Sequence, residues 1–364
     1  MFPYWLLFTL CAAGAFQNRP NPNTRVQGGP LLVILAVFVA LMVGLRFEVG
    51  GDWTAYLQIF YSMRYMGLVE AATMSDPGYA LLNWLVLQAG AEIWLVNLVC
   101  AAIFAWGLAA FARRQPNPWM AFVIAVPYLV IVVGMGYTRQ GVAIGLIMLG
   151  IVQLRDSHSI WRFALYIFAA ATFHKTAVIV LPLVSLASTQ NRFLLAGIGA
   201  ALAVMLYYFF IYAELDQLMQ NYVTDEYDSS GAMVRLAMNL PPAIIFLLLR
   251  SRMSLHDFDY KLWRNFSYAG IIAFGFLFVL ASSTVIDRLG LYVIPLQMFV
   301  YSRLPTLFGK PPFENGAMKI GIIAYSGLVL YVWLTAATHS SQWLPYTVYP
   351  LLSDHTVTLD RGSP

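Results

Sequence analysis

The sequence predicts an all-α, polytopic integral membrane protein with about 12 transmembrane helices, and three observations support this prediction. Hydrophobic residues make up 60% of the 364-residue chain, and charged residues only 10%. The mean hydropathy is +0.70. A soluble domain carries about 25% charged residues, so this composition is not that of an ordinary soluble enzyme. Finally, the apolar residues fall into runs of a length suited to a lipid bilayer.

These runs define the expected crossings in order, at residues 1–16, 30–45, 92–112, 118–136, 140–154, 161–173, 175–188, 193–212, 234–249, 265–283, 286–302 and 318–338. The first run lacks the basic start of a signal peptide, so we interpret it as a retained helix. We find no linker or internal repeat, and we treat residues 1–364 as one domain.

One further run, residues 77–88, is too short to span a bilayer alone. It follows Asp76-Pro77-Gly78 and is expected to form a re-entrant or interfacial segment. Asp76 itself is expected to serve only the turn. The loops 47–76 and 213–231 are rich in acidic residues and tyrosine, and are expected to form amphipathic helices or a lid.

The basic residues of the connecting segments predict which way the chain faces. With twelve crossings, most Lys and Arg residues share one side, which is cytoplasmic by the positive-inside rule. Polar residues from distant helix ends then share the outer side, where we expect a cavity: Arg46, Asp52, Arg139, Gln140, His174, Lys175, Arg235, Asp287 and Arg288. The pI near 9.0 arises from scattered loop cations and indicates no nucleic-acid partner.

Arg139 and Gln140 separate two apolar runs, next to Tyr137, and are the leading site candidates. A charged side chain at membrane depth costs about 3 kcal/mol or more, so it usually faces a protein interior or a water-filled cavity. Gly134 and Gly141 flank this stretch and permit close packing or a broken helix. We therefore expect the other polar groups of the outer side to converge here.

Asp52 follows Gly50-Gly51 at the end of an apolar run. Two interpretations have similar weight. It is the N-cap of the next helix, or it is a carboxylate beside Trp53 and Tyr56, an arrangement suited to sugar binding or to proton abstraction.

His174 and Lys175 interrupt an apolar stretch at a tight turn. They form either a helix cap with a snorkelling lysine or a titratable nitrogen with a cation. Asp287 and Arg288 begin a late apolar helix, where the dipole disfavours Arg288 and indicates an anionic partner. Arg235 begins another helix and either joins this site or pairs with one of the nearby acidic residues Asp225, Glu226 and Asp228.

The chain contains no Walker A, HExxH or EF-hand motif, so a nucleotide or metal reaction has no sequence support. Cys11 and Cys100 lie singly in apolar runs. We therefore expect no metal and no cofactor. Several arginines facing one cavity suit a phosphate or pyrophosphate, because the guanidinium fork matches phosphate oxygens.

Five motifs in this order resemble the EpsG family of Wzy-like polysaccharide polymerases. They are R-F-E-V-G-G-D-W-T-A-Y from Arg46, D-P-G-Y-A-L-L-N from Asp76, G-Y-T-R-Q-G-V-A from Gly136, F-H-K-T-A from Phe173 and D-R-L-G-L-Y from Asp287. Related members commonly carry glutamate where Asp76 stands, which weakens any claim for a specific acid there.

The resemblance implies a GT-C-like glycosyltransferase of the bacterial inner membrane that joins oligosaccharide repeat units carried on undecaprenyl pyrophosphate at the outer face. Within that reaction we expect His174 or Asp52 as the general base. The pyrophosphate is expected at Arg139, Arg288, Arg46 and Arg235. The residues expected to bind or orient the sugar are Gln140, Trp53, Tyr56, Tyr137, Lys175 and Asp287. The expected partners are the lipid-linked oligosaccharide and the lipid bilayer, with a flippase and a chain-length co-polymerase as candidates.

Two other functions remain open. A transporter or flippase of lipid-linked glycans also has many helices and a buried arginine, but it should show repeated halves and polar residues accessible from both sides. A membrane glycan O-acyltransferase could use His174 as its base. Such an enzyme usually draws its donor from the cytoplasm, where we find no comparable polar cluster.

Overall fold

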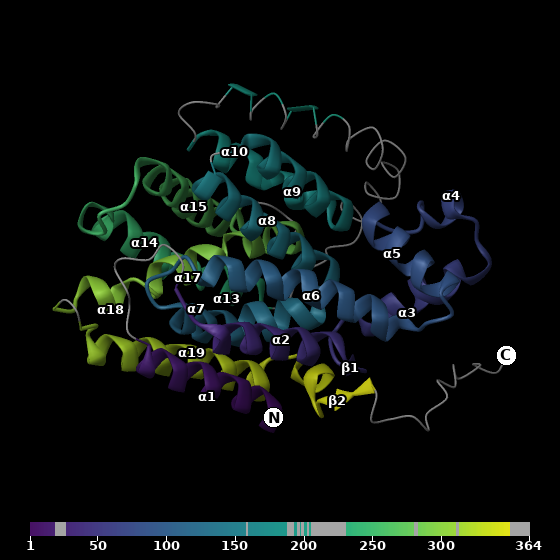
Figure 1. Cartoon of the computed structure of the whole chain (residues 1–364), viewed down its shortest axis with the longest axis horizontal. Helices are drawn as coiled ribbons and strands as arrows, with labels where there is room; N and C mark the ends of the chain where they lie inside the picture. Colours follow the sequence, from purple (N-terminus) through teal and green to yellow (C-terminus); the bar gives the residue numbers. More distant parts are fainter. Residues whose placement is uncertain are drawn as a thin grey trace.

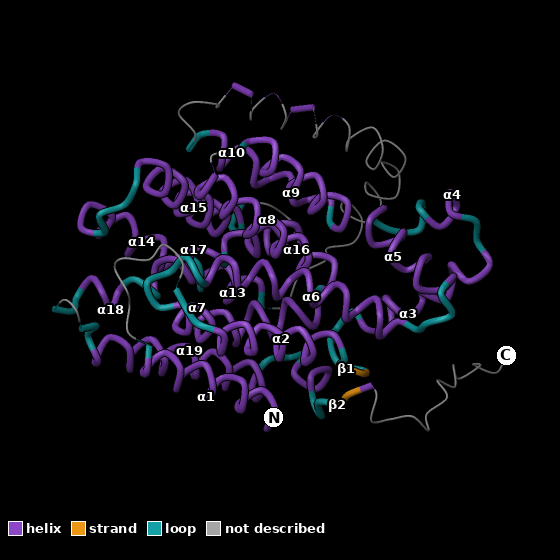
Figure 2. Tube along the Cα trace, viewed as in Figure 1, coloured by secondary structure: helices purple, strands orange, loops and turns teal. Residues whose placement is uncertain are grey.

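The computed structural model describes residues 1–18, 27–157, 159–187, 231–279, 283–310 and 313–349, with a few single positions between 193 and 204. This part of the chain is almost entirely helical, with one two-stranded sheet (Figures 1 and 2). The predicted all-α class is confirmed. The expected crossing at 193–212 and the acidic loop residues 213–230 lie largely outside the described residues.

The longer helices pack lengthwise into a bundle (Figure 1). Their bounds are α1 Phe2–Gln17, α2 Pro30–Gly44, α6 Ile93–Ala112, α7 Pro118–Ala125, α8 Thr138–Ser157, α9 Ile160–Phe173, α14 Leu240–Leu249, α15 Asp257–Phe276 and α19 Gly316–Ala336. Shorter pieces complete it: η3 Lys175–Ile179, α10 Val180–Ser185, α13 Ala232–Ala237, η5 Arg250–Arg252, α16 Ser283–Gly290, η6 Leu291–Val293, α17 Pro295–Tyr301, α18 Leu304–Leu307 and η7 Ser340–Trp343.

Helix α8 forms the centre of the bundle. All of its residues from Gln140 to Val152 are buried, and it packs against α6 and α9. A Cβ atom on Gly107 would lie 2.0 Å from the carbonyl oxygen of Gly145, so the crossing of α6 and α8 requires glycine. The charged side chains of α8 are therefore restricted to its two ends.

The expected helix 118–136 changes type along its length. After α7 the chain continues as a π-helix, η2, over Val126–Gly134. Pro127 lies in the first turn of this segment and has no N–H to donate, which favours a departure from α-helical bonding. The chain then turns at Tyr137, whose N–H donates to Val133, and α8 begins at Thr138.

Among the described residues, three helices are long and apolar enough to cross a membrane: Ile93–Ala112, Ala232–Arg252 and Gly316–Ala336. Five shorter apolar helices have 10–17 residues. The expected count of about 12 crossings is therefore not confirmed.

Two expected boundaries are wrong. Helix α15 begins at Asp257 rather than near residue 265, because Asp257 and Asp259 suit the positive end of the helix dipole and Lys261 pairs with Asp257 at 2.7 Å. The expected helix 286–302 is divided into α16, η6 and α17, with Pro295 in the first turn of α17.

The segment between α2 and α6 forms a separate group of short helices at one end of the bundle, on the right in Figure 1. They are α3 Trp53–Ser62, η1 Met63–Tyr65, α4 Leu68–Ala71 and α5 Pro77–Gln88. Helix α3 buries Trp53, Tyr56 and Phe60, which confirms the expected amphipathic helix. Helix α5 packs against α6 and α9 and has only 12 residues, as its apolar run predicted.

The small sheet joins residues from the two ends of the chain. Strand β1 Arg46–Phe47 pairs antiparallel with β2 Thr347–Val348. Next to it, the Gly50 N–H donates to the Gln342 carbonyl at 2.9 Å. This pairing holds the turn that leads into α3.

Candidate functional site

Arg139 lies in the first turn of α8 and forms an ion pair across the bundle end. Its Nη1 donates to Asp76 Oδ2 at 2.8 Å and to Ser75 Oγ at 3.1 Å. Its Cζ lies 5.8 Å from the ring centroid of Tyr56 and 6.0 Å from that of Tyr79. A cation at a helix N-terminus opposes the dipole, so the Asp76 carboxylate offsets an unfavourable position.

His174 lies on the other side of the same carboxylate. Its Nδ1 is 3.8 Å from Asp76 Oδ2, which is longer than a hydrogen bond. The Lys175 backbone N–H donates to Asp76 Oδ1 at 3.2 Å. His174 is buried, and neither ring nitrogen has a hydrogen-bond partner. It is the C-cap residue of α9 and the N-cap residue of η3, as the capping interpretation expects, although its side chain makes no capping hydrogen bond.

Asp52 occupies the N-cap position of α3, but its side chain accepts no capping hydrogen bond. The cations whose charge acts on it are Arg288 and Arg139. Burial raises the pKa of Asp52, and these two guanidinium groups partly offset the rise. The carboxylate is therefore no side-chain cap of α3, and the charges of Arg288 and Arg139 act on it.

Arg288 is the exposed cation of the group. Its backbone carbonyl accepts a 2.6 Å hydrogen bond from Gln140 Nε2, which ties α16 to α8. Among the described residues its guanidinium has no hydrogen-bond partner and no carboxylate within ion-pair distance. Its charge acts on Asp52, Tyr137 and His174, so it belongs to the same cluster.

Arg46 is buried, and each of its three guanidinium nitrogens donates to a protein oxygen. Its Nε donates to the Val49 carbonyl at 3.1 Å, Nη1 to the Val43 carbonyl at 2.6 Å, and Nη2 to Thr138 Oγ1 at 2.7 Å. Because Thr138 precedes Arg139, these bonds connect the end of α2 to the start of α8. At 1% exposure, the guanidinium presents almost no surface to a ligand in this structure.

Arg235 and Asp287 form a bidentate ion pair with each other. Nε donates to Oδ1 at 2.7 Å and Nη2 to Oδ2 at 2.6 Å, and both side chains are buried. The pair joins α13 to α16. The acids of the preceding loop, which were expected to compete for Arg235, lie outside the described residues.

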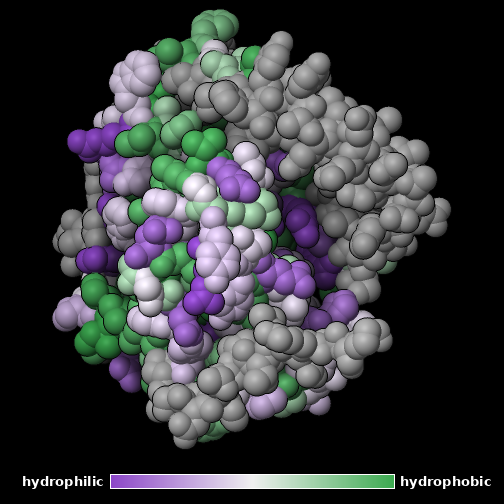
Figure 3. Space-filling model, turned by 90° about the vertical axis from the view of Figure 1, so that its right-hand side faces the viewer, coloured by the Kyte–Doolittle hydropathy of each residue, from purple (hydrophilic) through white to green (hydrophobic). Residues whose placement is uncertain are grey.

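The predicted aromatic and orienting residues also gather here. Trp53 and Tyr56 are buried, while Tyr137 and Lys175 are half-buried. The charges of the Arg235–Asp287 pair act on Tyr137, and so do those of Asp52 and Arg288. Figure 3 looks onto this end of the molecule, where hydrophilic side chains gather beside a hollow.

The backbone around Asp52 is held by close packing. Gly50 has φ +110°, and a Cβ there would lie 2.4 Å from the Met135 carbonyl oxygen. Trp343 Nε1 donates to the Ile131 carbonyl at 2.8 Å, and its ring covers Gly136. Residues near the C-terminus therefore set the distance between the Gly50-Gly51 turn and the start of α8.

The charges of the cluster shift one another. Burial would raise the pKa of Asp76, but His174 and Arg139 outweigh it and hold this pKa below its usual value. Burial lowers the pKa of His174, and Asp76 opposes that effect. At neutral pH the site therefore contains a carboxylate, a neutral imidazole and two arginines.

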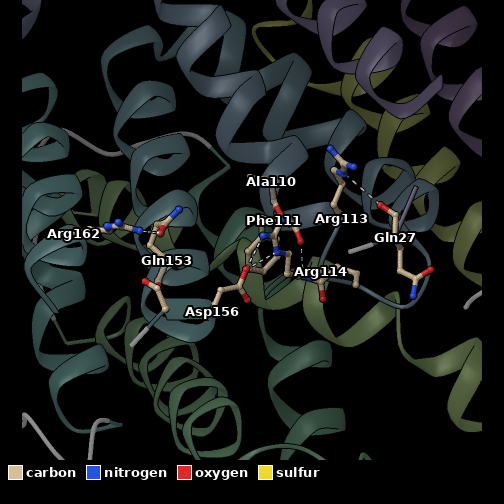
Figure 4. Close-up of polar contacts among 10 residues, drawn as sticks. Gln27, Ala110, Phe111, Arg113, Arg114, Gln153, Asp156 and Arg162 are labelled. Carbon is tan, nitrogen blue, oxygen red and sulfur yellow. Dashed lines mark hydrogen bonds and ion pairs between the residues drawn. The ribbon is translucent and has the colours of Figure 1, made fainter. Parts of the chain in front are cut away.

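We call the end of α8 that carries Arg139 the site end, and the end that carries Asp156 the far end. There Arg114 pairs with Asp156 at 2.6 Å, Arg155 with Asp259 at 3.2 Å, and Arg162 Nη1 reaches Gln153 Oε1 at 3.5 Å. Figure 4 shows the first and last of these contacts beside the exposed ends of α6 and α8.

Sequence reasoning missed Asp76. The expectation that it serves only the turn is wrong: it stands at the N-cap position of α5, yet its carboxylate contacts Arg139 and Lys175 and not its own helix. An acidic residue at the same place in a recurring motif was the available signal. All twelve predicted site residues lie at this end, although their roles remain predictions. No group of three His, Cys, Asp or Glu able to hold a metal occurs among the described residues.

A comparison with known families matches residues 30–348 to the EpsG family. The matched range contains every residue of the cluster. No curated protein and no solved structure gave a match. With nearly the whole chain matched, the protein belongs to the EpsG family, whose members are Wzy-like polymerases.

Proposed function

We propose that this protein is a polysaccharide polymerase that joins oligosaccharide repeat units carried on undecaprenyl pyrophosphate. Family membership supports a polymerase-type activity in a membrane. The observation that carries the proposal is that, among the described residues, the Arg288 guanidinium and the buried imidazole of His174 lie in one cluster and neither has a hydrogen-bond partner. Glycosyl transfer from a lipid pyrophosphate needs these two groups: a cation for the leaving group and a base for the attacking hydroxyl.

In the proposed reaction, an acceptor sugar hydroxyl attacks C1 of the donor chain. The new O–C1 bond forms as the C1–O bond to the pyrophosphate breaks. His174 takes the hydroxyl proton, and undecaprenyl pyrophosphate departs with the bond electrons. Arg288 binds the departing pyrophosphate, where an oriented cation stabilises the developing charge. Asp52, whose pKa is raised, is the second candidate base.

The remaining predicted arginines take other parts in this proposal. The side chain of Arg139 is 27% exposed. It adds a second positive charge to the one that Arg288 supplies. Arg46 and Arg235 support the framework, because their donors are already bonded to protein oxygens. Gln140 orients Arg288 through its backbone. Tyr137, which is half-buried, is the aromatic side chain available to a sugar ring, and the buried Trp53 and Tyr56 support the site.

We place the site end at the extracytoplasmic face of the bacterial inner membrane. The far end carries Arg113, Arg114, Arg155 and Arg162, and the positive-inside rule favours the cytoplasm for such a set. A flippase would then deliver the donor to the site end, and a co-polymerase would control chain length.

The test uses a deletion strain complemented with the wild-type protein, Arg288→Ala or the far-end control Arg162→Ala. Extracted lipid-linked glycans are separated by size and mass, and membrane protein levels are measured by blotting. Single undecaprenyl-linked repeat units that accumulate with Arg288→Ala, but not with Arg162→Ala, support the proposal. Full-length polymer from Arg288→Ala contradicts the pyrophosphate assignment. Repeat units trapped at the inner face in the deletion strain indicate a flippase instead, and polymer lacking only a substituent indicates an acyltransferase.

A further inference from the structure

One carboxylate connects three separate elements at the site end. Asp76 Oδ2 accepts from Arg139 at the start of α8 and lies 3.8 Å from Nδ1 of His174 at the end of α9. Asp76 Oδ1 accepts from the backbone N–H of Lys175 at the start of η3. The side chain is 6% exposed, so these protein groups replace almost all of its water.

The position of Asp76 is set by local packing. Pro77 begins α5, and a Cβ on Gly78 would lie 2.5 Å from Thr172 Oγ1. The start of α5 therefore fits against the last turn of α9, immediately before His174. This close approach aims the carboxylate at the His174 turn and away from the first N–H groups of its own helix.

We propose that Asp76 is a positioning residue that holds the His174 ring with Nδ1 toward the carboxylate and Nε2 toward the acceptor hydroxyl. This inference rests on the proposed function. The hydroxyl proton passes to Nε2, and the imidazolium that forms keeps its Nδ1 proton beside Asp76. The carboxylate stays ionised because Arg139 is bonded to it at 2.8 Å. The 3.8 Å separation shortens when substrate fills the site, as catalytic contacts commonly do.

The charges that face His174 come from each element around it. They are Asp76 before α5, Arg139 in α8 and Arg288 in α16, with Lys175 next in the chain. Asp76 favours the protonated ring, whereas the two arginines disfavour it. Removing the carboxylate charge therefore lowers the pKa of the His174 imidazole further and weakens its function as a base.

The experiment measures polymerisation by purified protein in liposomes that contain lipid-linked repeat units, over a range of pH and acceptor concentration. Asp76→Asn removes the charge and keeps the shape, Asp76→Glu restores the charge, and Asp156→Asn is the matched control from the Arg114–Asp156 pair. We expect Asp76→Asn to lose about 10- to 100-fold in maximal rate, by analogy with residues that orient a metal-binding histidine through a hydrogen bond. The acceptor concentration that gives half of the maximal rate should change little. The acid limb of the pH profile should move to lower pH. Asp76→Glu should recover part of the rate, with the limb near its wild-type position.

Three results overturn the inference while the wild type remains active. Asp76→Asn has the activity of Asp156→Asn, or it loses activity without a shift of the acid limb, or Asp76→Glu gives no rescue. The second and third describe a purely structural carboxylate. A wild-type protein that makes no polymer from these units overturns the proposed function itself, and this inference with it, so the two failures are distinguishable.

A second measurement determines the His174 tautomer in the wild-type protein and uses a variant only to assign the signal. In wild-type protein labelled with 15N-histidine, the His174 signal is assigned by its loss in His174→Gln; the chain has five histidines. We expect the tautomer with the proton on Nδ1 at neutral pH. A proton on Nε2 overturns the proposed orientation.

Discussion

The two ends of α8 carry similar charges but use them differently. At the far end, Arg114 binds Asp156 at 2.6 Å, and that carboxylate is 31% exposed. At the site end, Arg139 binds Asp76 at 2.8 Å, and Asp76 is 6% exposed. An exposed ion pair is screened by water and contributes about 0–1 kcal/mol. A shielded pair acts strongly on the groups beside it.

The neighbours of each pair differ as well. The far-end contacts join neighbouring helix ends, with Gln153 bonded to Arg162 and Asp259 to Arg155. The site-end pair adjoins a buried imidazole whose two nitrogens have no partner. Buried polar groups are nearly always hydrogen-bonded, so such an exception calls for a functional explanation. The comparison teaches that a shielded ion pair beside a titratable side chain without a hydrogen-bond partner, and not charge alone, distinguishes the site end from the far end.

The sharpest test replaces the two arginines of α8 itself. Arg139→Ala should lower polymerisation about 100- to 1,000-fold, the range found when a charge-stabilising donor is lost. Each change also removes the arginine beside a buried carboxylate, Asp76 for Arg139 and Asp259 for Arg155. Arg155→Ala, at the far end, should stay within about twofold of wild type. Polymer length and yield in the complemented deletion strain measure both. Equal losses from the two variants would remove the distinction between the ends.

A second test alters the backbone that supports the site end. Gly50→Ala combines left-handed strain with a Cβ 2.4 Å from the Met135 oxygen. We expect a cost of about 1–3 kcal/mol for the overpacking, a lowered thermal midpoint, and a roughly tenfold loss of activity as Asp52 moves. Gly90→Ala is the control: it has φ +70° but no atom within 4 Å of the added Cβ, so only the strain of about 1 kcal/mol remains. Similar midpoints for both variants would show that the contact with Met135 is unimportant.

A third test uses pH to ask whether burial at the site end controls the reaction. Burial holds the pKa of His174 below its ordinary value of 6.5, so the neutral, proton-accepting form persists to lower pH. Wild-type polymerisation should keep more than half of its rate at pH 6.5 and decline only below it. Initial rates in liposomes between pH 5 and 8 check this. A half-loss at or above pH 6.5 would indicate an ordinary, solvated base.

The smallest effect is expected at the far end. Asp156→Asn breaks the Arg114–Asp156 pair, which is exposed, so stability should change by about 0–1 kcal/mol and activity by less than twofold. Thermal unfolding and polymer yield measure the two quantities. A large loss would mean that the far-end pairs couple to the reaction.

Part of the site was predictable from the chain alone. Arg139, His174, Asp52 and Arg288 are polar interruptions of apolar runs, and such residues are costly in a membrane unless they serve a cavity. Asp76 was not recognised as part of it, because Asp-Pro-Gly is also an ordinary turn and nothing local shows where its carboxylate points. The chain likewise assigned Arg46 and Arg235 to pyrophosphate, although their donors are bonded to protein oxygens.

The sequence by itself determined the helical class, most helix positions and the polar interruption beside Tyr137. Those features follow from hydrophobic run length and from where glycine and proline interrupt it, which are local properties. Only the tertiary structure decided which charges neutralise one another and which keep free bonding capacity. That division depends on contacts such as Arg139–Asp76, Arg235–Asp287 and Arg46–Thr138, between residues 52 to 92 positions apart. The energy of a charge is set by the partners and solvent around it, and both are assembled only when distant helix ends meet.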